Sequence, residues 1–352
     1  MGARLGVVVL TVALVAGCAG SVSPSVAPSR ALSGGPLPSG TFVAEYGYGS
    51  GDTGSGHGTF LSLFDDHSGR HLRDLLHFDE GAQLQLAGFS RTADGSVVYA
   101  TARGPSVRGH VNGGDPRPGS CGGTVYLLDA RTGRVTSLFN VGKDWTVRAP
   151  VMSPDGRSVA YLSQACTATF ADRLVVRDLA TGAERHVWAP GTSAARVRWR
   201  GDGRQLVFTV FYPDQRSPSD VPSYVVVPSD ADGAQSSSAV RHAPDQGCVV
   251  ENAVYSRSGI QLVEGCPDEV TAPARLVQLR GDGPAVEWRT STALCPSGMT
   301  AAYDPQGRLL VTATMRCGGD AAPVDVVQVW EGRHDREVGR YVNPQQFVSA
   351  AT

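Results

Sequence analysis

A short phrase of residues recurs five times along the chain and restricts the local structure wherever it stands. Each copy has an aromatic or large apolar residue, a polar turn that ends in Gly, and an apolar strand. The copies are Phe89 with Asp94-Gly95, Met152–Gly156, Trp199–Gly203, Tyr255–Gly259 and Tyr303–Gly307. Gly permits the positive φ that tight turns require, so each copy predicts a hairpin between two buried strands.

A second phrase, an apolar strand followed by a turn such as 129–133, alternates with the first. Its glycines are separated by 64, 49, 51, 50 and 49 residues; they are Gly69, Gly133, Gly182, Gly233, Gly283 and Gly332. Two hairpins in a period of about fifty residues give four strands per unit. No stretch has the periodicity of an amphipathic helix. Six such units predict an all-β fold, a six-bladed β-propeller with four-stranded antiparallel blades.

The predicted blades follow one another without a second linker. Their bounds are residues 41–77, 85–140, 146–190, 195–241, 248–292 and 299–342. The first blade lacks the first phrase. We expect residues 345–351, at the far end of the chain, to supply its missing strand, because a propeller has to cover its strand edges. A tail that stays outside the ring is the alternative.

The segment MSPDGRSVAY (residues 152–161) resembles the repeat of TolB-type, WD-repeat-like propellers, and residues 199–208 form a second copy. The resemblance implies a six-bladed propeller over nearly the whole mature domain. It implies no particular function, because this repeat binds periplasmic partners in TolB and forms a lid domain in propeller-bearing peptidases. Phe89, with its longer turn, and Tyr255, without Asp or Pro, depart from the repeat.

The N-terminus has the features of an export signal. Arg4 supplies a positive start, and Leu5–Val15 is an apolar run too short to span a bilayer. Val15-Ala16-Gly17-Cys18 resembles a lipobox, so residues 1–17 are predicted to be a lipoprotein signal peptide and Cys18 to carry palmitate and other acyl chains. The alternative is an ordinary secretory signal beside a chance cysteine.

The residues behind Cys18 are rich in Ser, Pro, Gly and Ala, a composition that favours a flexible tether over residues 18–40. Residues 41–352 then form the propeller. The predicted location is the extracytoplasmic face of the cell membrane, with the domain held by the lipid on Cys18.

Arginine strongly predominates over lysine: Lys143 is the only lysine among the 31 Lys and Arg residues. This bias is typical of GC-rich, actinomycete-type genomes. The formal net charge is −2 with scattered signs. A nucleic-acid partner requires a basic stripe, so we expect none. We expect a monomer without a cofactor.

Six cysteines remain besides Cys18, an even number in a chain predicted to be exported. Two pairs lie symmetrically, within a residue, about the fourth and fifth copies of the first phrase. Residues so placed face each other on antiparallel strands. The absence of a Cys-x-x-Cys spacing argues against a metal or catalytic role. The predicted disulfides are Cys248–Cys266 and Cys295–Cys317 from this symmetry, and Cys121–Cys166 as the remaining pair, between equivalent loops of blades two and three.

Loop lengths differ between the two faces of the predicted ring. The turns of both phrases take about four residues, whereas the other connections within blades are long, as at residues 102–123. The long connections and the links between blades emerge together on one face, which we call the long-loop face. Aromatic and Arg side chains are frequent interface anchors. The candidate binding residues there are Arg103, Arg108, His110, Arg117, Trp145, Phe170, Phe211, Tyr212, Glu251 and Asp268.

These features predict a membrane-tethered binding or scaffold lipoprotein that docks a protein, peptide or glycan on its long-loop face. The sequence contains no Gly-x-Ser-x-Gly, His-Glu-x-x-His or phosphate-binding Gly-rich motif, so no catalytic or metal-binding residue is assigned. Two alternatives stay open. A propeller hydrolase or lyase would need three or four His, Asp or Glu side chains around a metal in the central channel. The other alternative is an accessory or sensor subunit of an envelope transporter.

Overall fold

The structure is a computed structural model of the whole chain. Within the described residues it consists of strands and their connections, and it contains no helix with the length and apolarity that crossing a membrane requires. The described residues are 35–48, 58–79, 84–103, 121–166, 172–188, 193–211, 223–231, 233, 240–241, 249–257, 259–265, 273–279, 286–293, 296–303, 308–315, 324–331, 334–342 and 349–351.

The described strands form six antiparallel sheets of four strands each. The first blade contains β24 (Ser349–Ala351), β1 (Thr41–Tyr48), β2 (Gly58–Asp65) and β3 (His71–Asp79). The second contains β4 (Leu84–Arg91), β5 (Val97–Arg103), β6 (Gly123–Leu128) and β7 (Val135–Asn140). The third contains β8 (Arg148–Met152), β9 (Ser158–Ser163), β10 (Arg173–Asp178) and β11 (Glu184–Trp188).

The other three blades have the same strand order. The fourth contains β12 (Ser193–Trp199), β13 (Gln205–Phe211), β14 (Ser223–Pro228) and β15 (Val240–Arg241). The fifth contains β16 (Val249–Ser256), β17 (Gly259–Gly265), β18 (Pro273–Leu279) and β19 (Val286–Ala293). The sixth contains β20 (Pro296–Tyr303), β21 (Leu309–Met315), β22 (Val324–Glu331) and β23 (His334–Val342).

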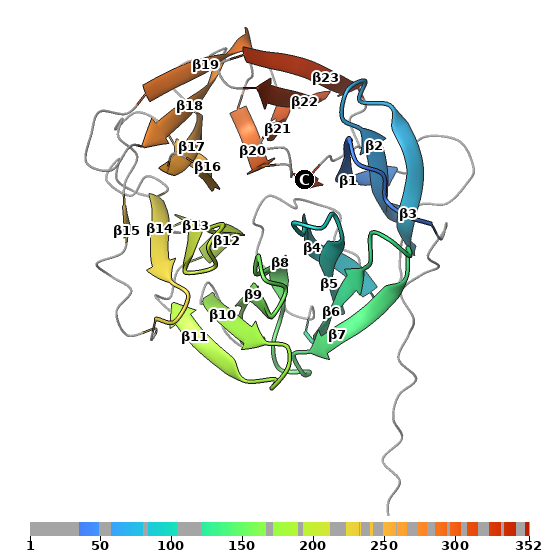
Figure 1. Cartoon of the computed structure of the whole chain (residues 1–352), viewed down its shortest axis with the longest axis vertical. Coiled ribbons are helices and arrows are strands. Elements are labelled where there is room, and N and C mark those ends of the chain that lie inside the picture. The colour runs from blue at the N-terminus through green and yellow to red at the C-terminus, as the bar shows by residue number, and fades with distance from the viewer. Residues whose placement is uncertain are drawn as a thin grey trace, which may run out of the picture.

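The blades stand around a central axis and form a closed ring (Figure 1). The first strand of each sheet as given above lies innermost. In blade one this place is taken by β24, which pairs antiparallel with β1 through Val43↔Ala351 and Glu45↔Ser349. The six-bladed fold and the closure by the end of the chain are therefore confirmed.

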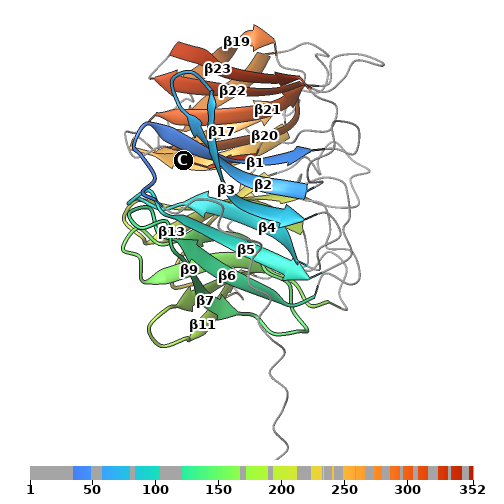
Figure 2. The ribbon, with the colours of Figure 1, turned by 90° about the vertical axis from the view of Figure 1, so that its right-hand side faces the viewer.

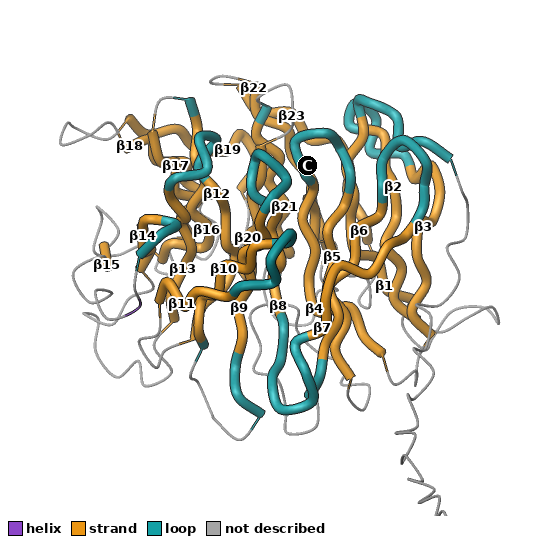
Figure 3. The backbone as a smooth tube through the Cα atoms, turned by 60° about the horizontal axis from the view of Figure 1, so that its bottom comes forward, coloured by secondary structure: helices purple, strands orange, loops and turns teal. Residues whose placement is uncertain are grey.

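The two faces of the ring differ as the loop lengths predict. The short turns project from one face, which we call the short-turn face (Figure 2). In Figure 3 these turns lie at the upper end of the strands, and the link between β7 and β8 lies at the lower end. The long connections run between strands whose described ends match the expected bounds, for example Arg103 of β5 and Gly123 of β6.

In blades one to three, the turns of the second phrase form because one aspartate closes each of them. In the blade-two turn, Oδ1 of Asp129 accepts hydrogen bonds from the backbone of Arg131 at 2.9 Å and Thr132 at 2.8 Å, and from the Thr132 hydroxyl. Gly133 then takes a φ of +67°, which disfavours a side chain. The hydrogen bonds from Thr132 lower the pKa of Asp129. Asp65 and Asp178 make the same set of contacts in blades one and three.

The hydrophobic core lies between adjacent blades, where the faces of neighbouring sheets meet. In the cluster between blades three and four, Trp188 of β11 packs edge-on against Phe208 of β13, with ring centroids 4.8 Å apart. Both side chains are almost completely buried. Further clusters join blades one and two, two and three, and four and five. Because each sheet is covered on both sides by its neighbours, the ring stabilises itself as one unit.

Side chains near the short turns also bond across the blade boundaries. The Ser90 hydroxyl of blade two donates to the Pro150 carbonyl of blade three at 2.7 Å, and the Arg91 side chain bonds the carbonyl of Thr41 in blade one. Across the closure, Arg308 of blade six pairs with Asp66 of blade one. These bonds position neighbouring blades relative to one another in addition to apolar packing.

A buried carboxyl lies beside the closing strand and makes the fold sensitive to pH. Glu45 of β1 is 5% exposed, and its Oε2 atom has no hydrogen-bond partner. Burial raises the pKa of Glu45 from 4.5 to about 8. The folded chain therefore keeps a proton that the unfolded chain releases. The stability contributed by the neutral carboxyl is complete below pH 4.5 and is lost as the pH rises through 8.

We expect Glu45→Gln to remove this dependence, because the amide has no charge to bury. The free energy of unfolding of the variant relative to the parent should grow by about 3 kcal/mol between pH 5 and pH 8. Urea unfolding of both proteins over that pH range measures the difference. A constant offset between the two curves would contradict a raised pKa at Glu45.

Candidate functional site

The predicted binding residues on the long-loop face are only partly within the described residues. Trp145 and Glu251 have described side chains. Arg103 and Phe211 are the last residues of β5 and β13, so they stand at strand ends rather than inside loops. The other six, Arg108, His110, Arg117, Phe170, Tyr212 and Asp268, lie outside the described residues.

A disulfide joins Cys121 and Cys166, the pair predicted between blades two and three. Each cysteine flanks a long connection, so the bridge ties the ends of two such loops together on the long-loop face. Cys248, Cys266, Cys295 and Cys317 lie outside the described residues, and the described pairing in blade five ends at Val249↔Gly265, one residue short of two of them.

Trp145 supports this corner of the long-loop face. Its backbone carbonyl accepts a hydrogen bond from Gly122 at 2.8 Å, and its backbone forms a bridge with Ala165. The Arg173 guanidinium stacks over the Trp145 ring, 4.8 Å from the centroid. An aromatic residue and a basic residue therefore stand together beside the disulfide, at the place where the sequence predicts an anchor.

The prediction that Glu251 belongs to a loop is wrong. It stands inside β16, the innermost strand of blade five, at a bulge between Val250 and Asn252. Its carbonyl and carboxylate both accept from Arg196 of β12, in blade four. The side chain therefore contributes to the junction between two blades, and the physical reason is the extra residue that the bulge inserts.

The innermost strands of blades two to six all carry a bulge at an equivalent place. Two residues in these bulges have positive φ without being glycine, Ala149 at +45° and Arg196 at +59°. The bulge of blade two contains Gly88, with a φ of +122°, where a Cβ would come within 2.9 Å of the Ala149 nitrogen. Such bulges redirect side chains along the axis side of each blade.

A charged pair beside one of these bulges also bonds the neighbouring blade. Arg148 of β8 bonds Asp172, which is 1% exposed, and the second carboxylate oxygen of Asp172 accepts from the Ala194 backbone of blade four at 2.8 Å. In blade four, burial and the nearby charge of Arg196 lower the pKa of Arg198 to about 10. Arg198 therefore stays charged at neutral pH. The described residues hold no group of three His, Cys, Asp or Glu side chains arranged for a metal.

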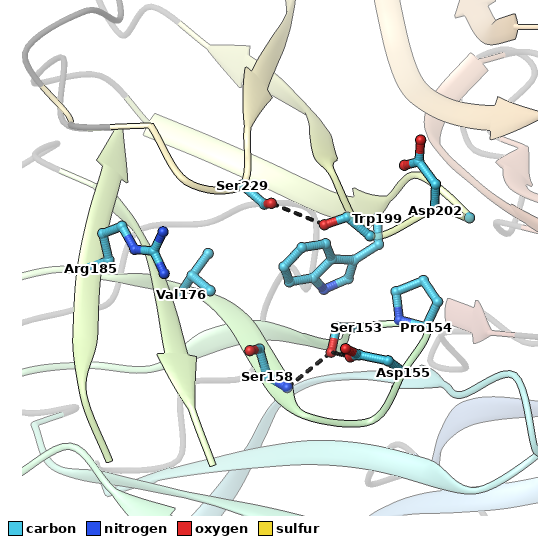
Figure 4. A pocket seen from close by; sticks show the side chains of 11 residues that line it. Ser153, Pro154, Asp155, Ser158, Val176, Arg185, Trp199, Asp202 and Ser229 are labelled. Atoms are coloured by element: carbon cyan, nitrogen blue, oxygen red, sulfur yellow. Dashed lines mark hydrogen bonds between the residues drawn. The ribbon is translucent and has the colours of Figure 1, made fainter. Parts of the chain in front are cut away.

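A pocket of about 390 Å³ opens on the short-turn face between blades three and four (Figure 4). The indole of Trp199 stands at its centre. One wall is the β8–β9 turn with Pro154 and Asp155, and the other is the β12–β13 turn with Asp202. The sequence identifies these residues only as turn residues. Their juxtaposition follows from the ring, because successive copies of one phrase in neighbouring blades must lie side by side.

Comparison with known proteins yields no match to a protein-family profile and no match among curated sequences. Solved structures do match. TolB from Acinetobacter baumannii superposes with a TM-score of 0.57 at 17% identity, over 89% of this chain and 66% of its own. A TolB from Agrobacterium tumefaciens superposes with a TM-score of 0.51 at 11% identity, over 88% of this chain and 97% of its own.

The fold is that of a TolB-like β-propeller. At these identities the likeness concerns the fold alone. The chain spans just under two thirds of the length of the Acinetobacter protein. Two surface features of this propeller are built from described side chains: the long-loop corner around Trp145 and the pocket around Trp199.

Proposed function

We propose that this chain is a lipid-anchored, extracytoplasmic TolB-like propeller that binds a protein, peptide or glycan partner of the cell envelope on its long-loop face. The anchor is the acylated Cys18. The sequence predicts a tether over residues 18–40, but residues 35–40 lie against the domain, so residues 19–34 are left as the tether. The partner approaches the loops beside the Cys121–Cys166 disulfide. No chemistry of bond making or breaking is assigned to it.

The observation that supports this orientation is the path of the first described residues. Leu37 is buried between blades one and two, and its backbone nitrogen bonds the Ala130 carbonyl in the β6–β7 turn at 2.5 Å. The Arg73 guanidinium donates to the Pro36 carbonyl at 2.8 Å, and the Gly40 carbonyl accepts from the Asp66 backbone nitrogen at 3.0 Å. The chain therefore enters the domain on the short-turn face. A tether attached there directs the long-loop face away from the membrane.

The tether is short relative to the ring. Sixteen residues of a Ser/Pro/Gly-rich coil have an r.m.s. span of roughly 22 Å. This span keeps the short-turn face close to the lipid surface and leaves the opposite face free for docking. The disulfide and the Arg173–Trp145 stack hold part of that face in one conformation, which reduces the entropy lost on binding.

The anchor is tested with Cys18→Ser in a bacterial host that acylates lipoproteins. We expect the parent to partition into the detergent phase and Cys18→Ser to lose this behaviour nearly completely, because no acyl chain is attached. Ser23→Ala, in the same tether, is the matched control and should behave as the parent. Equal partitioning of parent and Cys18→Ser would contradict lipidation, and the mass of the N-terminal peptide identifies the modification directly.

The docking face is tested with the single lysine. Lys143 is exposed in the β7–β8 link on the long-loop face, so an amine-reactive photo-cross-linker labels the parent there. The matched variant Lys143→Arg/Arg131→Lys moves the label to the exposed β6–β7 turn on the short-turn face. We expect discrete cross-linked products on membranes from the parent and not from the variant. Equal products from both, or products from the variant alone, would contradict docking on the long-loop face.

A further inference from the structure

The pocket between blades three and four combines an aromatic wall with polar groups of both signs. Trp199 packs one side of its indole on the core between these blades, and its other side lines the pocket. The indole nitrogen donates to the Val151 carbonyl at 3.0 Å. This hydrogen bond fixes the orientation of the indole, so its pocket-facing side is positioned to stack against a flat apolar surface of a ligand.

The hydroxyl groups around the ring are already engaged within the protein. Ser153 donates to Asp155 at 2.6 Å and accepts from the Ser158 backbone at 2.9 Å, and Ser229 donates to the Gly203 carbonyl at 2.9 Å (Figure 4). They stabilise the walls. The polar groups that face a ligand are therefore the charged side chains at the rim.

The charges at the rim balance one another. Asp155 uses one carboxylate oxygen, Oδ1, for both the Ser153 hydroxyl and the Arg157 nitrogen, and the Ser153 hydrogen bond lowers the pKa of Asp155. Asp202 Oδ2 lies 3.3 Å from Arg200 Nε, so the arginine offsets the negative charge of Asp202. Arg185, exposed on β11, is the opposing cation across the pocket. The two aspartates would repel an anionic ligand, and Arg185 would repel a cationic ligand. A neutral ligand that donates and accepts hydrogen bonds would meet no such repulsion.

We propose that this pocket binds a neutral saccharide. A pyranose ring has an apolar C–H face, which stacks on the Trp199 indole, and equatorial hydroxyls that donate to Asp155 and accept from Arg185. Charge-assisted hydrogen bonds of this kind supply directional specificity. The volume of about 390 Å³ is in the range of small-ligand sites and accommodates one or two sugar rings. The site lies on the short-turn face, so it is independent of the docking proposed for the long-loop face.

The walls of the pocket offer a blocking substitution that leaves Trp199 in place. Gly201 lines the pocket, has no left-handed φ, and has open space where a Cβ would stand. Gly201→Leu therefore introduces an apolar side chain into the opening without backbone strain. The control is Tyr255→Phe, at the position in blade five equivalent to Trp199, where only a hydroxyl contact with Gln205 is lost.

The test uses the whole mature domain and a panel of neutral saccharides: maltose, cellobiose, trehalose, methyl mannoside and methyl galactoside. Glucuronic acid and glucosamine serve as the anionic and cationic probes. Saturation-transfer NMR followed by titration measures binding. We expect at least one neutral saccharide to bind with a Kd on the order of 1 mM, weakened about tenfold or more by Trp199→Ala and by Gly201→Leu and unchanged by Tyr255→Phe.

Three results would overturn the proposal: no saturable binding of any neutral saccharide up to roughly 20 mM, equal binding by the parent and Gly201→Leu, or stronger binding of a charged probe. Gly201→Leu keeps the test decisive if Trp199→Ala fails to fold. A failure here leaves the cross-linking result from Lys143 unaffected, because that label reports on the opposite face.

Discussion

Removal of the last four residues, 349–352, is expected to lower the free energy of unfolding by about 3 kcal/mol or more, because it opens the ring. The deletion removes β24, which pairs with Val43, Ala44 and Glu45 of β1. Val43 and Ala44 are fully buried, so their backbone groups and the adjacent core would be exposed at a new strand edge. Urea unfolding of the purified domain, followed by fluorescence, measures the loss.

The control is removal of Thr352 alone, which should leave the unfolding midpoint unchanged because the described pairing with β1 ends at Ala351. Ala350→Pro is a second test, because proline cannot donate the backbone hydrogen bond of a ladder strand. It should destabilise the domain without shortening the chain. A four-residue deletion that unfolds at the same midpoint as the parent would show that β24 does not close the ring.

Asp172→Ala is expected to cost about 3–5 kcal/mol, the penalty for removing one member of a buried ion pair. The substitution leaves Arg148, whose side chain is only 16% exposed, without its carboxylate, and the Ala194 nitrogen without its acceptor. Both groups lie at the junction of blades three and four. Equilibrium denaturation in urea gives the change, and the slope of the transition reports whether the unfolding remains cooperative.

The exposed pair Arg200–Asp202 is the control for Asp172→Ala. Its side chains are 51% and 40% exposed, so Arg200→Ala should cost about 0.5 kcal/mol or less. The double variant Arg148→Ala/Asp172→Ala should recover part of the loss, because no unpaired charge is then left inside. A loss for Asp172→Ala as small as that for Arg200→Ala would mean that this carboxylate does not join the blades.

The architecture was predictable because its determinants are local and periodic. In blades one to three the second phrase carries its own closing aspartate and glycine, as at Asp129 and Gly133, so the turn is encoded within five residues. The interval of about fifty residues between most of these turns gives the blade size, and the missing first hairpin of blade one indicates the closing strand. The pairing of Cys121 with Cys166 was predicted only as the pair that remained, and the structure contains it.

The bulges could not be predicted from the same pattern. A bulge adds one residue to an inner strand that is five to eight residues long. The number of residues per repeat varies by more than this, so the repeat pattern does not reveal the bulge. Its consequence is large, because it reverses the side to which Arg196 and Glu251 point and brings them together from blades four and five. The sequence separation of 55 residues gives no signal for that contact.

The pocket was missed for a different reason. Asp155 and Trp199 were recognised as parts of the repeated turn phrase and were explained by that local role. Two consecutive turns of a ring must be neighbours, so a comparison of the phrase between adjacent blades would have placed both residues at one opening. The mixed signs of charge around it depend on side-chain directions, which the repeat does not encode.

The completion of blade one by the last strand means that the ring can close only when both ends of the domain are present. β1 lies at the start of the propeller and β24 at its end, so one edge of β1 stays unpaired until the intervening blades have folded. An unpaired strand edge accepts any strand that reaches it, so a second copy of the chain competes with closure during folding. The three residues of β24 therefore protect the domain against exchange of strands between copies.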